Sequence, residues 1–497
     1  MARGEGFIRK HGLWTEDQHR QALTIKGRAE KDNLKLFRVA WADPHGASRA
    51  KTLTVPAFFA ALESGHNTNV ATTTLDASGA RTFASFTRGG GMGLDEMTGS
   101  PSMIIVPDPA TFRVLPWEPD VGWILCDEYF TSGVPFHFSP RQLLRKQLAR
   151  LSARKLRCIV GLEVEWYLLA LADQHLTSDH VGGPGLRGRA PSTYPVEPGF
   201  SFHSESNMDL MHKPVAALAD AFERLGLPLR SIENEWGPGQ LECTFAPREA
   251  LEAADNLVLF RTATRQLCRR MGYLATFMSR PALQGYYSSG WHLHQSLVDT
   301  ATGDNAFMPD VEGQILSPTG MAYLGGLMGH ALASTIFANP TINGYRRFRA
   351  NSLAPDRVAW CSDHRGVMLR VLGAANDPAS RIENRVGEPS ANPYLYILSQ
   401  IVAGLDGIDN KRDPGPPDTD PYATKHPMLP KTLSDALVLM EKEELFRNEL
   451  GPLFVDYYGK LKRTEIARYE KFAADNNIDP ASDDTTAWEQ DEYLDFF

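Results

Sequence analysis

Hydrophobic and polar residues alternate in short runs through the first quarter of the chain. A lead-in over residues 1–34 is polar and charged, which predicts a helical or loose segment. Strands are predicted for LKLFRVAWAD (34–43), AKTLTV (50–55) and SMIIVPD (102–108), separated by turn sequences such as DPHG and GSP. A short amphipathic helix, AFFAALESG (57–65), lies between them. We therefore expect a small α+β domain over residues 35–130.

The pattern changes near residue 138, where strands begin to alternate with longer helices. A Ser-Pro pair opens a helix in FHFSPRQLLRKQLARL (136–151). Strands are predicted for IVGLEVEWYLLA (159–170) and WHLHQSL (291–297), a strand–turn–strand unit for SIENEWGPGQLECTF (231–245), and helices for LMHKPVAALADAFERLG (210–226) and ALEAADNLVLFRTATRQLCRRMG (250–272). The Pro/Asp-rich segment 411–422 predicts an exposed loop before a helical tail from about residue 431. Residues 138–497 are expected to form the second, larger domain.

Composition and charge exclude several classes of protein. The 497 residues include 42% hydrophobic and 22% charged side chains, as in ordinary globular proteins, and the net charge of -9 gives no basic footprint for nucleic acid or an anionic membrane. No window approaches the roughly 18 apolar residues of a membrane helix, and MARGEGFIRKHGLW lacks the apolar segment of a signal peptide. Five scattered cysteines without a CxxC pair predict free buried thiols in a reducing cytoplasm.

Two pairs of glutamates place like charges side by side. Glu163 and Glu165 lie two residues apart on a predicted strand, so both side chains leave the same face. Adjacent carboxylates repel unless a cation or another partner neutralises them. Glu235 and Glu242 flank the turn GPGQ, which lets them converge. Each pair alone is also compatible with a salt-bridged or solvated strand face.

Two histidines and a fifth glutamate extend this set. His292 and His294 share one face of their predicted strand. A single histidine is usually structural, but two on one face are better candidates for binding a metal or a phosphate. Glu383 shares a face with Arg385 if RIENRVG is a strand. Five carboxylates with one or two imidazoles and no thiolate suit hard divalent ions, Mg²⁺ or Mn²⁺, and could hold two or three of them.

A dense set of arginines follows the histidines. Guanidinium forks bind carboxylates and phosphates with two parallel hydrogen bonds, and metals with arginines are the apparatus of phosphoryl transfer. Ordinary surface charge is the alternative, but the clustering favours a site. The six residues are Arg346, Arg347, Arg349, Arg357, Arg365 and Arg370.

The glycine run GGGMG (89–93) does not follow a strand and open a helix, and the chain contains no GxxxxGK[ST]. Any ATP site is therefore neither a P-loop nor a Rossmann crevice. The run itself predicts a flexible loop that could line a site.

Taken in order, these segments resemble the glutamine synthetase superfamily. The resemblance spans about residues 138–410, and residues 35–125 are similar, with weaker motifs, to that family's small β-grasp domain. The matching segments are GLEVEW, ENEWGPGQLE, ALEAADN, ATFMSRP, SSGWHLHQSL, ANPTINGYRRF, AP…W…HRGVMLRV and RIENRVGEPSANPYL.

This resemblance implies an α+β fold: an N-terminal β-grasp domain and a C-terminal catalytic domain built on a curved antiparallel sheet with helices. It implies an active site at the interface between subunits, and rings of subunits, commonly a dodecamer of two stacked hexamers. The activity implied is ligation of the γ-carboxyl of L-glutamate to an amine, with ATP as co-substrate and a γ-glutamyl phosphate intermediate. Metals and arginines would neutralise the charge that gathers on the transferred phosphoryl group.

The family's site residues carry over one by one. Glu165, Glu235 and Glu242 would bind the metal on the glutamate side, and Glu163, His292 and Glu383 the metal on the phosphate side. His294 and Ser296 match positions near the nucleotide phosphates. Arg347 matches the arginine that holds the α-carboxylate of glutamate, and Arg385 the arginine that closes the glutamate end. Arg365 and Arg370 match catalytic arginines that contact phosphates and the reacting γ-carboxyl.

Three departures from the family pattern bear on the amine. Leu353 stands where enzymes that use ammonia carry a glutamate that covers the site and takes a proton from ammonium. The stretch TRGGGMG (87–93) replaces a loop with an ammonium-binding aspartate, although Asp95 could be displaced into that role. Tyr287-Ser288-Ser289-Gly290 replaces the usual N-G-S-G before the first histidine.

Loss of two cation-handling acids disfavours ammonium and, more mildly, a charged polyamine. An apolar or aromatic primary amine fits better, because an aniline-type nitrogen is neutral at pH 7 and needs no general base to become nucleophilic. We therefore expect a γ-glutamylanilide synthetase-like ligase in amine catabolism, with Leu353 in the amine pocket. The alternatives are a γ-glutamylpolyamine synthetase, a true glutamine synthetase, or a catalytically inactive structural member of the superfamily.

Overall fold

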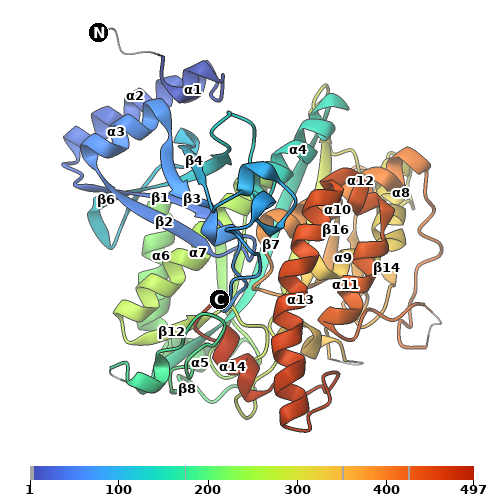
Figure 1. Cartoon of the computed structure of the whole chain (residues 1–497). Coiled ribbons are helices and arrows are strands. Elements are labelled where there is room, and N and C mark those ends of the chain that lie inside the picture. Colours follow the sequence, from blue (N-terminus) through green and yellow to red (C-terminus); the bar gives the residue numbers. More distant parts are fainter. Residues whose placement is uncertain (1–4, 174, 350–351, 424–425) are drawn as a thin grey trace.

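The computed structural model describes residues 5–173, 175–349, 352–423 and 426–497. Its strands form two sheets, a six-stranded sheet from residues 36–129 and a ten-stranded sheet from residues 156–387. Helices of the C-terminal third, in orange and red in Figure 1, lie on the opposite side of the molecule from the blue N-terminal helices. Among the described residues, no single helix is long and apolar enough to cross a membrane, and one helix pair passes that test only together, bent by 80°.

The six-stranded sheet is covered by three N-terminal helices. Its order is β2 (Ser48–Thr54), β1 (Leu36–Ala42), β6 (Glu118–Tyr129), β4 (Ser102–Pro107) and β3 (His66–Asn69), with β5 (Arg113–Leu115) also paired to β6. Only β1 and β6 pair in parallel. The helices are α1 (Phe7–Lys10), α2 (Glu16–Lys31) and α3 (Val55–Ser64). Phe37 of β1 stacks on Phe58 of α3 with ring centroids 3.8 Å apart, which fixes α3 on the sheet.

The ten-stranded sheet is built around one long strand, β7 (Leu156–Leu171). Its order is β14 (Trp360–Ser362), β15 (Leu369–Leu372), β16 (Arg381–Gly387), β13 (Trp291–Asp299), β7, β10 (Gln240–Phe245) and β9 (Leu229–Asn234); β8 (Thr193–Pro195), β11 (Arg248–Glu249) and β12 (Tyr273–Thr276) pair with β7. The pairing is antiparallel as expected, except that β14 and β15 run parallel. In this sheet only β13 separates β7 from β16, although the two strands lie more than 200 residues apart in the sequence.

Helices cover this sheet and form the tail of the chain. Among them, α10 has fourteen buried residues and packs against α4, α7, α8 and α9, so it is the central core helix. The bounds are α4 (Pro140–Ala153), α5 (Glu205–Leu210), α6 (His212–Leu225), α7 (Ala250–Arg270), α8 (Pro318–Gly329), α9 (Ala331–Ala338), α10 (Pro393–Asn410), α11 (Leu433–Lys442), α12 (Glu444–Leu450), α13 (Pro452–Asp475) and α14 (Ala487–Tyr493).

A buried ionic network connects strand β6 of the six-stranded sheet with helices α4 and α7. Arg141, at the start of α4, donates to Asp127 of β6 at 2.6 Å, to Asp108 at 2.7 Å and to Asp255 of α7 at 2.7 and 2.9 Å. These carboxylates compensate a guanidinium that is only 3% exposed. Removal of one partner from such a network would leave an uncompensated buried charge.

The glycine run at 89–93 forms a compact turn rather than an open loop. Residues 88–91 make one 3-10 turn in which Gly89 and Gly90 are buried and have positive φ. A Cβ atom at Gly90 would lie 2.4 Å from the carbonyl oxygen of Met97. Glycine is therefore required there by close packing within the chain.

Candidate active site

Strand pairing around β7 gathers the acidic residues and histidines that the sequence singles out. Glu165 of β7 lies directly opposite Glu242 of β10, and Glu163 lies opposite His292 of β13. On the far side of β13, Glu383 of β16 pairs with His294. The candidate site therefore takes its side chains from four adjacent strands, β16, β13, β7 and β10.

The side chains converge within coordination distance of one another. His292 Nδ1 lies 2.6 Å from Glu163 Oε1 and 3.8 Å from Glu383 Oε1, and its Nε2 lies 3.9 Å from Glu165 Oε1. His294 Nε2 lies 3.1 Å from Glu163 Oε2. In each of two triads, every residue offers one possible ligand atom, and these three atoms lie within 4.8 Å of one another. The triads are Glu163, His292 and Glu242, and Glu163, His294 and Glu383. His294 therefore contacts the acidic cluster directly, whereas the sequence analysis placed it near the nucleotide phosphates.

For three of the five carboxyl groups, the protein disfavours the ionised form and raises the pKa. Burial raises the pKa of Glu165, although the His292 imidazole opposes the shift. Burial and the Glu165 charge raise the pKa of Glu235 to about 8. Burial and the charges of Glu163 and Glu165 also raise the pKa of Glu242. A bound divalent cation would relieve this repulsion and release protons on binding.

The other two carboxylates are held ionised. Burial opposes ionisation of Glu163, but the His292 and His294 imidazoles outweigh it and lower its pKa. Burial likewise opposes ionisation of Glu383, which is outweighed by His292 and the Arg385 guanidinium. The donor set, carboxylates with imidazoles and no thiolate, fits Mg²⁺ or Mn²⁺.

Gln240 is a site residue that the sequence analysis missed. Its Nε2 donates to Glu165 Oε2 at 3.0 Å and to the Ser289 hydroxyl at 2.9 Å. The backbone N–H of Gly290 donates to the same Glu165 oxygen at 2.9 Å. Gln240 thereby ties the glutamate-side carboxylate to the loop before β13. Its signal was available, because it lies two residues before Glu242 on the same strand face.

Three of the predicted arginines lie at the acidic cluster. Arg370 Nη1 binds Glu383 Oε2 at 2.9 Å, and Arg385 binds the other oxygen of Glu383. Arg347 is buried, and its Nη1 donates to the carbonyls of Val386 at 2.7 Å and Gly387 at 2.6 Å. Its Nε is buried without a hydrogen-bond partner among the described residues, which leaves donor capacity for a ligand carboxylate.

Three arginines of the run, Arg346, Arg349 and Arg357, pair elsewhere and do not belong to this cluster. Arg346 is 2% exposed and binds Glu489 of α14 at 3.1 Å. Arg357 pairs with its neighbour Asp356 at 2.7 Å, and Arg349 Nε lies 3.7 Å from Asp483. Clustering in sequence therefore overstated the site, because alternate residues of an irregular segment face different partners. Arg365 is exposed in the turn before β15, and its carbonyl accepts from Arg385 Nε at 3.1 Å.

A cavity of about 560 Å³ opens beside Glu163 on the histidine side. His294 and Ser296 line it, as do Arg230 and Arg381. Arg381 Nε lies 3.3 Å from His294 Nδ1. A cavity with two guanidinium groups next to candidate metal ligands is suited to a phosphate-bearing substrate.

Four exposed aromatic residues lie around the other end of the acidic cluster. Trp236 follows Glu235 directly and stacks with Phe202 at 5.8 Å between centroids, and Phe200 contacts Tyr287 edge-on at 5.9 Å. The four rings are 42–53% exposed. Large apolar rings gathered at a surface mark a binding surface more often than chance exposure does. The loop character of residues 196–203 hid Phe200 and Phe202 from the sequence analysis.

Leu353 lies at the surface, 58% exposed, with φ of +60°. Its neighbours Ala350 and Asn351 lie outside the described residues. Asp95, the alternative acid, pairs with Arg88 at 3.3 Å. The assignment of Leu353 to the amine pocket stays a prediction.

Comparison with known proteins identifies the family. The model of the glutamine synthetase catalytic domain matches residues 137–480. The chain is 44% identical to the γ-glutamylanilide synthase of an Acinetobacter species, over 98% of each protein, and 29% identical to a glutamate–isopropylamine ligase of a Pseudomonas species, over 97% of this chain and 99% of that one. A solved structure, apo GmaS without ligand, superposes with a TM-score of 0.74 at 28% identity, over 90% of this chain and 96% of that chain; the GmaS/ADP complex gives 0.73. The chain belongs to the glutamine synthetase family and has its fold.

Proposed function

We propose that this enzyme joins the γ-carboxyl of L-glutamate to an aromatic amine of the aniline class, with hydrolysis of ATP to ADP and phosphate. The observation that carries the proposal is the convergence of four glutamates and two histidines on β7, β10, β13 and β16 beside three arginines, with Glu235 close enough to feel the Glu165 charge. The 44% identity to a γ-glutamylanilide synthase over 98% of both chains supports the choice of amine.

The arrangement assigns a part to each group in the reaction. Bound divalent ions would supply positive charge that screens the ATP phosphates and the γ-carboxylate from one another. Arg347 would bind the α-carboxylate of glutamate, since its Nε and Nη2 are not taken by the carbonyls that hold Nη1. Arg370, fixed by Glu383, would stabilise charge on the transferred phosphoryl group, and Arg365 would contact the same group. The γ-glutamyl phosphate so formed is an activated acyl donor, and amine attack expels phosphate.

The surroundings of the glutamate-side carboxylates favour an apolar amine. Phe200, Phe202, Trp236 and Tyr287 surround this end, and Leu353 adds no charge. Aromatic rings bind another ring by stacking or edge-on contact and offer nothing to an ammonium ion beyond cation–π attraction. Because an aniline nitrogen is neutral at pH 7, it can attack without a general base.

A panel of amines tests this proposal. Purified enzyme with L-glutamate, ATP and Mg²⁺ or Mn²⁺ should release phosphate faster with aniline than with ammonium, isopropylamine or putrescine. Faster release with ammonium or putrescine would establish glutamine or γ-glutamylpolyamine synthesis instead. Glu163→Ala is the control for catalysis: if activity and metal-dependent thermal stabilisation both survive in that variant, the metal site is wrongly assigned.

The family resemblance extends the proposal to assembly and compartment. We infer a homo-oligomer, a dodecamer of two hexameric rings, in which the small N-terminal domain of one subunit closes the site of the next. Light scattering coupled to size-exclusion chromatography measures the mass directly, and a monomer with full activity would contradict it. The five cysteines are buried and unpaired, which supports a reducing, cytoplasmic environment.

A further inference from the structure

Six arginines line a cavity of about 620 Å³ between the six-stranded sheet and helix α7. Its size lies in the usual range of small-molecule sites. None of its arginines belongs to the proposed catalytic set. We call this cavity the arginine pocket; the arginines that line it are Arg38, Arg49, Arg261, Arg265, Arg269 and Arg270.

Helix α7 presents its arginines as a ladder. Arg261, Arg265 and Arg269 follow one another at four-residue spacing, so they share one face of the helix. Like charges at this spacing destabilise a helix. Arg38 of β1 and Arg49 of β2 line the opposite wall of the pocket. Arginines of the six-stranded sheet therefore face arginines of helix α7 across the pocket.

Carboxylates of the chain compensate only part of this charge. Glu118 binds both Arg38 and Arg270, and Asp495 lies 2.6 Å from Arg269 and 3.5 Å from Arg265. Asp43 binds Arg49 at 2.7 Å. Within the described residues, three carboxylates thus serve five of the guanidinium groups and leave an excess of positive side-chain charge.

Arg261 is the sixth, and it has no ion pair within the described part of the chain. The residue is 8% exposed; its guanidinium donates to the backbone carbonyls of Pro389 and Ala391 and lies 5.8 Å from the ring centroids of Phe277 and Trp291. Its Nε is buried without any hydrogen-bond partner. Burial lowers the pKa of Arg261 to about 9, a sign that nearby negative charge does not offset its desolvation. None of these four partners lines the arginine pocket, so the positive charge that faces the pocket is that of the other five arginines.

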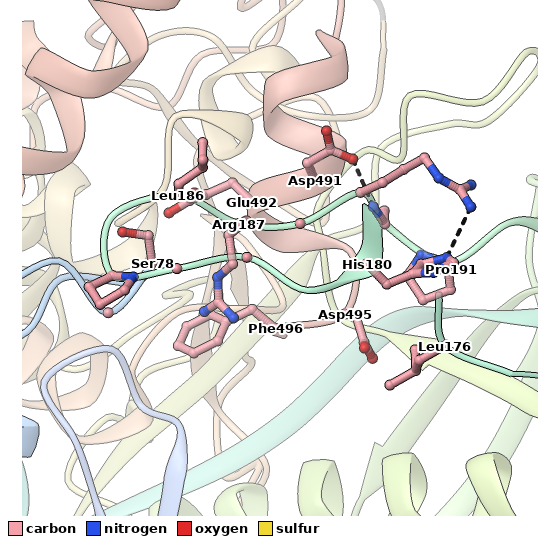
Figure 2. A pocket seen from close by; sticks show the side chains of 17 residues that line it. Ser78, Leu176, His180, Leu186, Arg187, Pro191, Asp491, Glu492, Asp495 and Phe496 are labelled. Atoms are coloured by element: carbon pink, nitrogen blue, oxygen red, sulfur yellow. Dashed lines mark hydrogen bonds between the residues drawn. The ribbon is translucent and has the colours of Figure 1, made fainter. Parts of the chain in front are cut away.

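The remaining walls of the pocket are apolar and aromatic. Trp123, Leu274 and Phe496 line them. The Phe496 ring has the Arg49 guanidinium 5.9 Å from its centroid and that of Arg187 at 4.6 Å. Figure 2 shows Arg187 beside Phe496 in a neighbouring cavity of about 450 Å³, so this ring contributes to both cavities. A ligand of the arginine pocket can therefore combine an anionic group with a flat apolar part.

We propose that the arginine pocket binds a small organic phosphate, with its phosphate on the arginines of α7 and its ring against Trp123 and Phe496. Guanidinium forks match phosphate oxygens bidentately, and the aromatic walls suit a base or another flat group. The alternative is that these arginines serve only to hold the six-stranded sheet against helix α7 through ion pairs. This alternative explains the arginines that already have carboxylate partners. It does not explain the excess of positive charge, five guanidinium groups against three carboxylates.

The test uses metal-free enzyme, so that it reports on binding and does not depend on turnover or on the identity of the amine. AMP and inorganic phosphate are titrated by calorimetry into wild type and into the double variant Arg49→Gln/Arg269→Gln, which removes one charge from each wall. The matched control is Arg154→Gln/Arg224→Gln, whose side chains are 35% and 54% exposed and pair elsewhere. We expect the double variant to bind AMP at least about tenfold more weakly, the control to bind like wild type, and inorganic phosphate to compete.

Equal AMP affinity in all three proteins would overturn the proposal, because any binding would then lie at the active site. Loss of AMP binding in His294→Ala but not in the double variant would overturn it too. If the double variant fails to fold, the single variant Arg270→Gln, 48% exposed, takes its place with the same expectation. A change of oligomeric mass in the variant, without phosphate binding by wild type, would show that the pocket is a subunit contact and also overturn the proposal.

Discussion

Glu242 lies directly opposite Glu165 in the antiparallel pairing of β10 with β7. Opposed like charges on neighbouring strands destabilise a sheet, and both carboxyl groups have a raised pKa because they are buried. Gln240 and the Gly290 N–H donate to Glu165 but leave this repulsion in place. The pair therefore stores a cost that a bound cation would remove.

Neutralising this pair should separate stability from function. Glu242→Gln keeps the shape of the side chain and removes the buried ionisable group, so we expect the metal-free protein to melt about 1–3 °C higher than wild type. Activity should fall at least about 100-fold, because a ligand of the glutamate-side metal is lost. Thermal melts with and without Mn²⁺ and phosphate release measure both effects.

The same melts compare how strongly Mn²⁺ stabilises the two proteins. Mn²⁺ should raise the melting temperature of wild type and should do so much less in Glu242→Gln. A variant that is less stable than wild type without metal, yet responds normally to Mn²⁺, would show that Glu242 is a structural residue.

Stability should also depend on pH through Glu128, far from the metal site. Burial, with a contribution from the Asp127 charge, raises the pKa of Glu128 from its ordinary value of 4.5 to about 8. Below pH 4.5 the carboxyl is protonated in both folded and unfolded chains. Between 4.5 and 8 only the unfolded chain ionises, so folded stability is lost as pH rises through this window and levels off above it.

Glu128→Gln should remove this dependence. Relative to wild type the variant should gain about 2.5 kcal/mol between pH 5.5 and 7.5, since one pKa unit corresponds to roughly 1.4 kcal/mol. Denaturant unfolding of both proteins at several pH values gives the difference directly. A difference that stays constant over this range, or that shrinks as pH rises, would refute a neutral buried Glu128.

The sequence predicted the site where side chains share an element and failed where tertiary contacts decide. The spacing of Glu163 and Glu165 gave their common face, and the family motifs supplied the order of the segments. Spacing alone did not give the cross-strand register that sets Glu242 opposite Glu165. Arg346 was grouped with the site because its partner, Glu489, lies 143 residues away and was invisible to local pattern. Phe200 and Phe202 were missed because an irregular loop has no periodicity to interpret.

Binding of glutamate should depend on the absence of a side chain at Gly290. A Cβ atom there would lie 2.7 Å from Arg347 Nη2, 3.2 Å from His292 Nε2 and 3.3 Å from Glu165 Oε1. Arg347 cannot simply move aside, because its Nη1 is held by two carbonyls. We expect Gly290→Ala to raise the KM for glutamate about tenfold or more, by analogy with other small displacements of binding groups.

A matched glycine substitution controls for general effects. Gly27→Ala adds the same methyl group in α2 where nothing lies within 4 Å, and it should leave kinetics unchanged. The KM for ATP should change little in Gly290→Ala, since the cavity lined by Ser296 and Arg230 lies beside Glu163. Equal increases in both KM values would indicate a collapse of the whole site and remove Arg347 from its assigned role.

Amine choice should respond to charge at position 353. Leu353 is 58% exposed and already has positive φ, so a glutamate there adds no backbone strain beyond that of leucine and buries no new group. A carboxylate at this position can hold ammonium and accept its proton, which leucine cannot. We therefore expect Leu353→Glu to raise the ratio of kcat/KM for ammonium to that for aniline about tenfold. Leu353→Gln is the control, with similar size and no charge, and its ratio should stay near that of wild type. If both variants change the ratio equally, shape rather than proton transfer acts at this position; if neither does, Leu353 lies outside the amine pocket, and the aromatic residues beside Glu235 alone would remain as its walls.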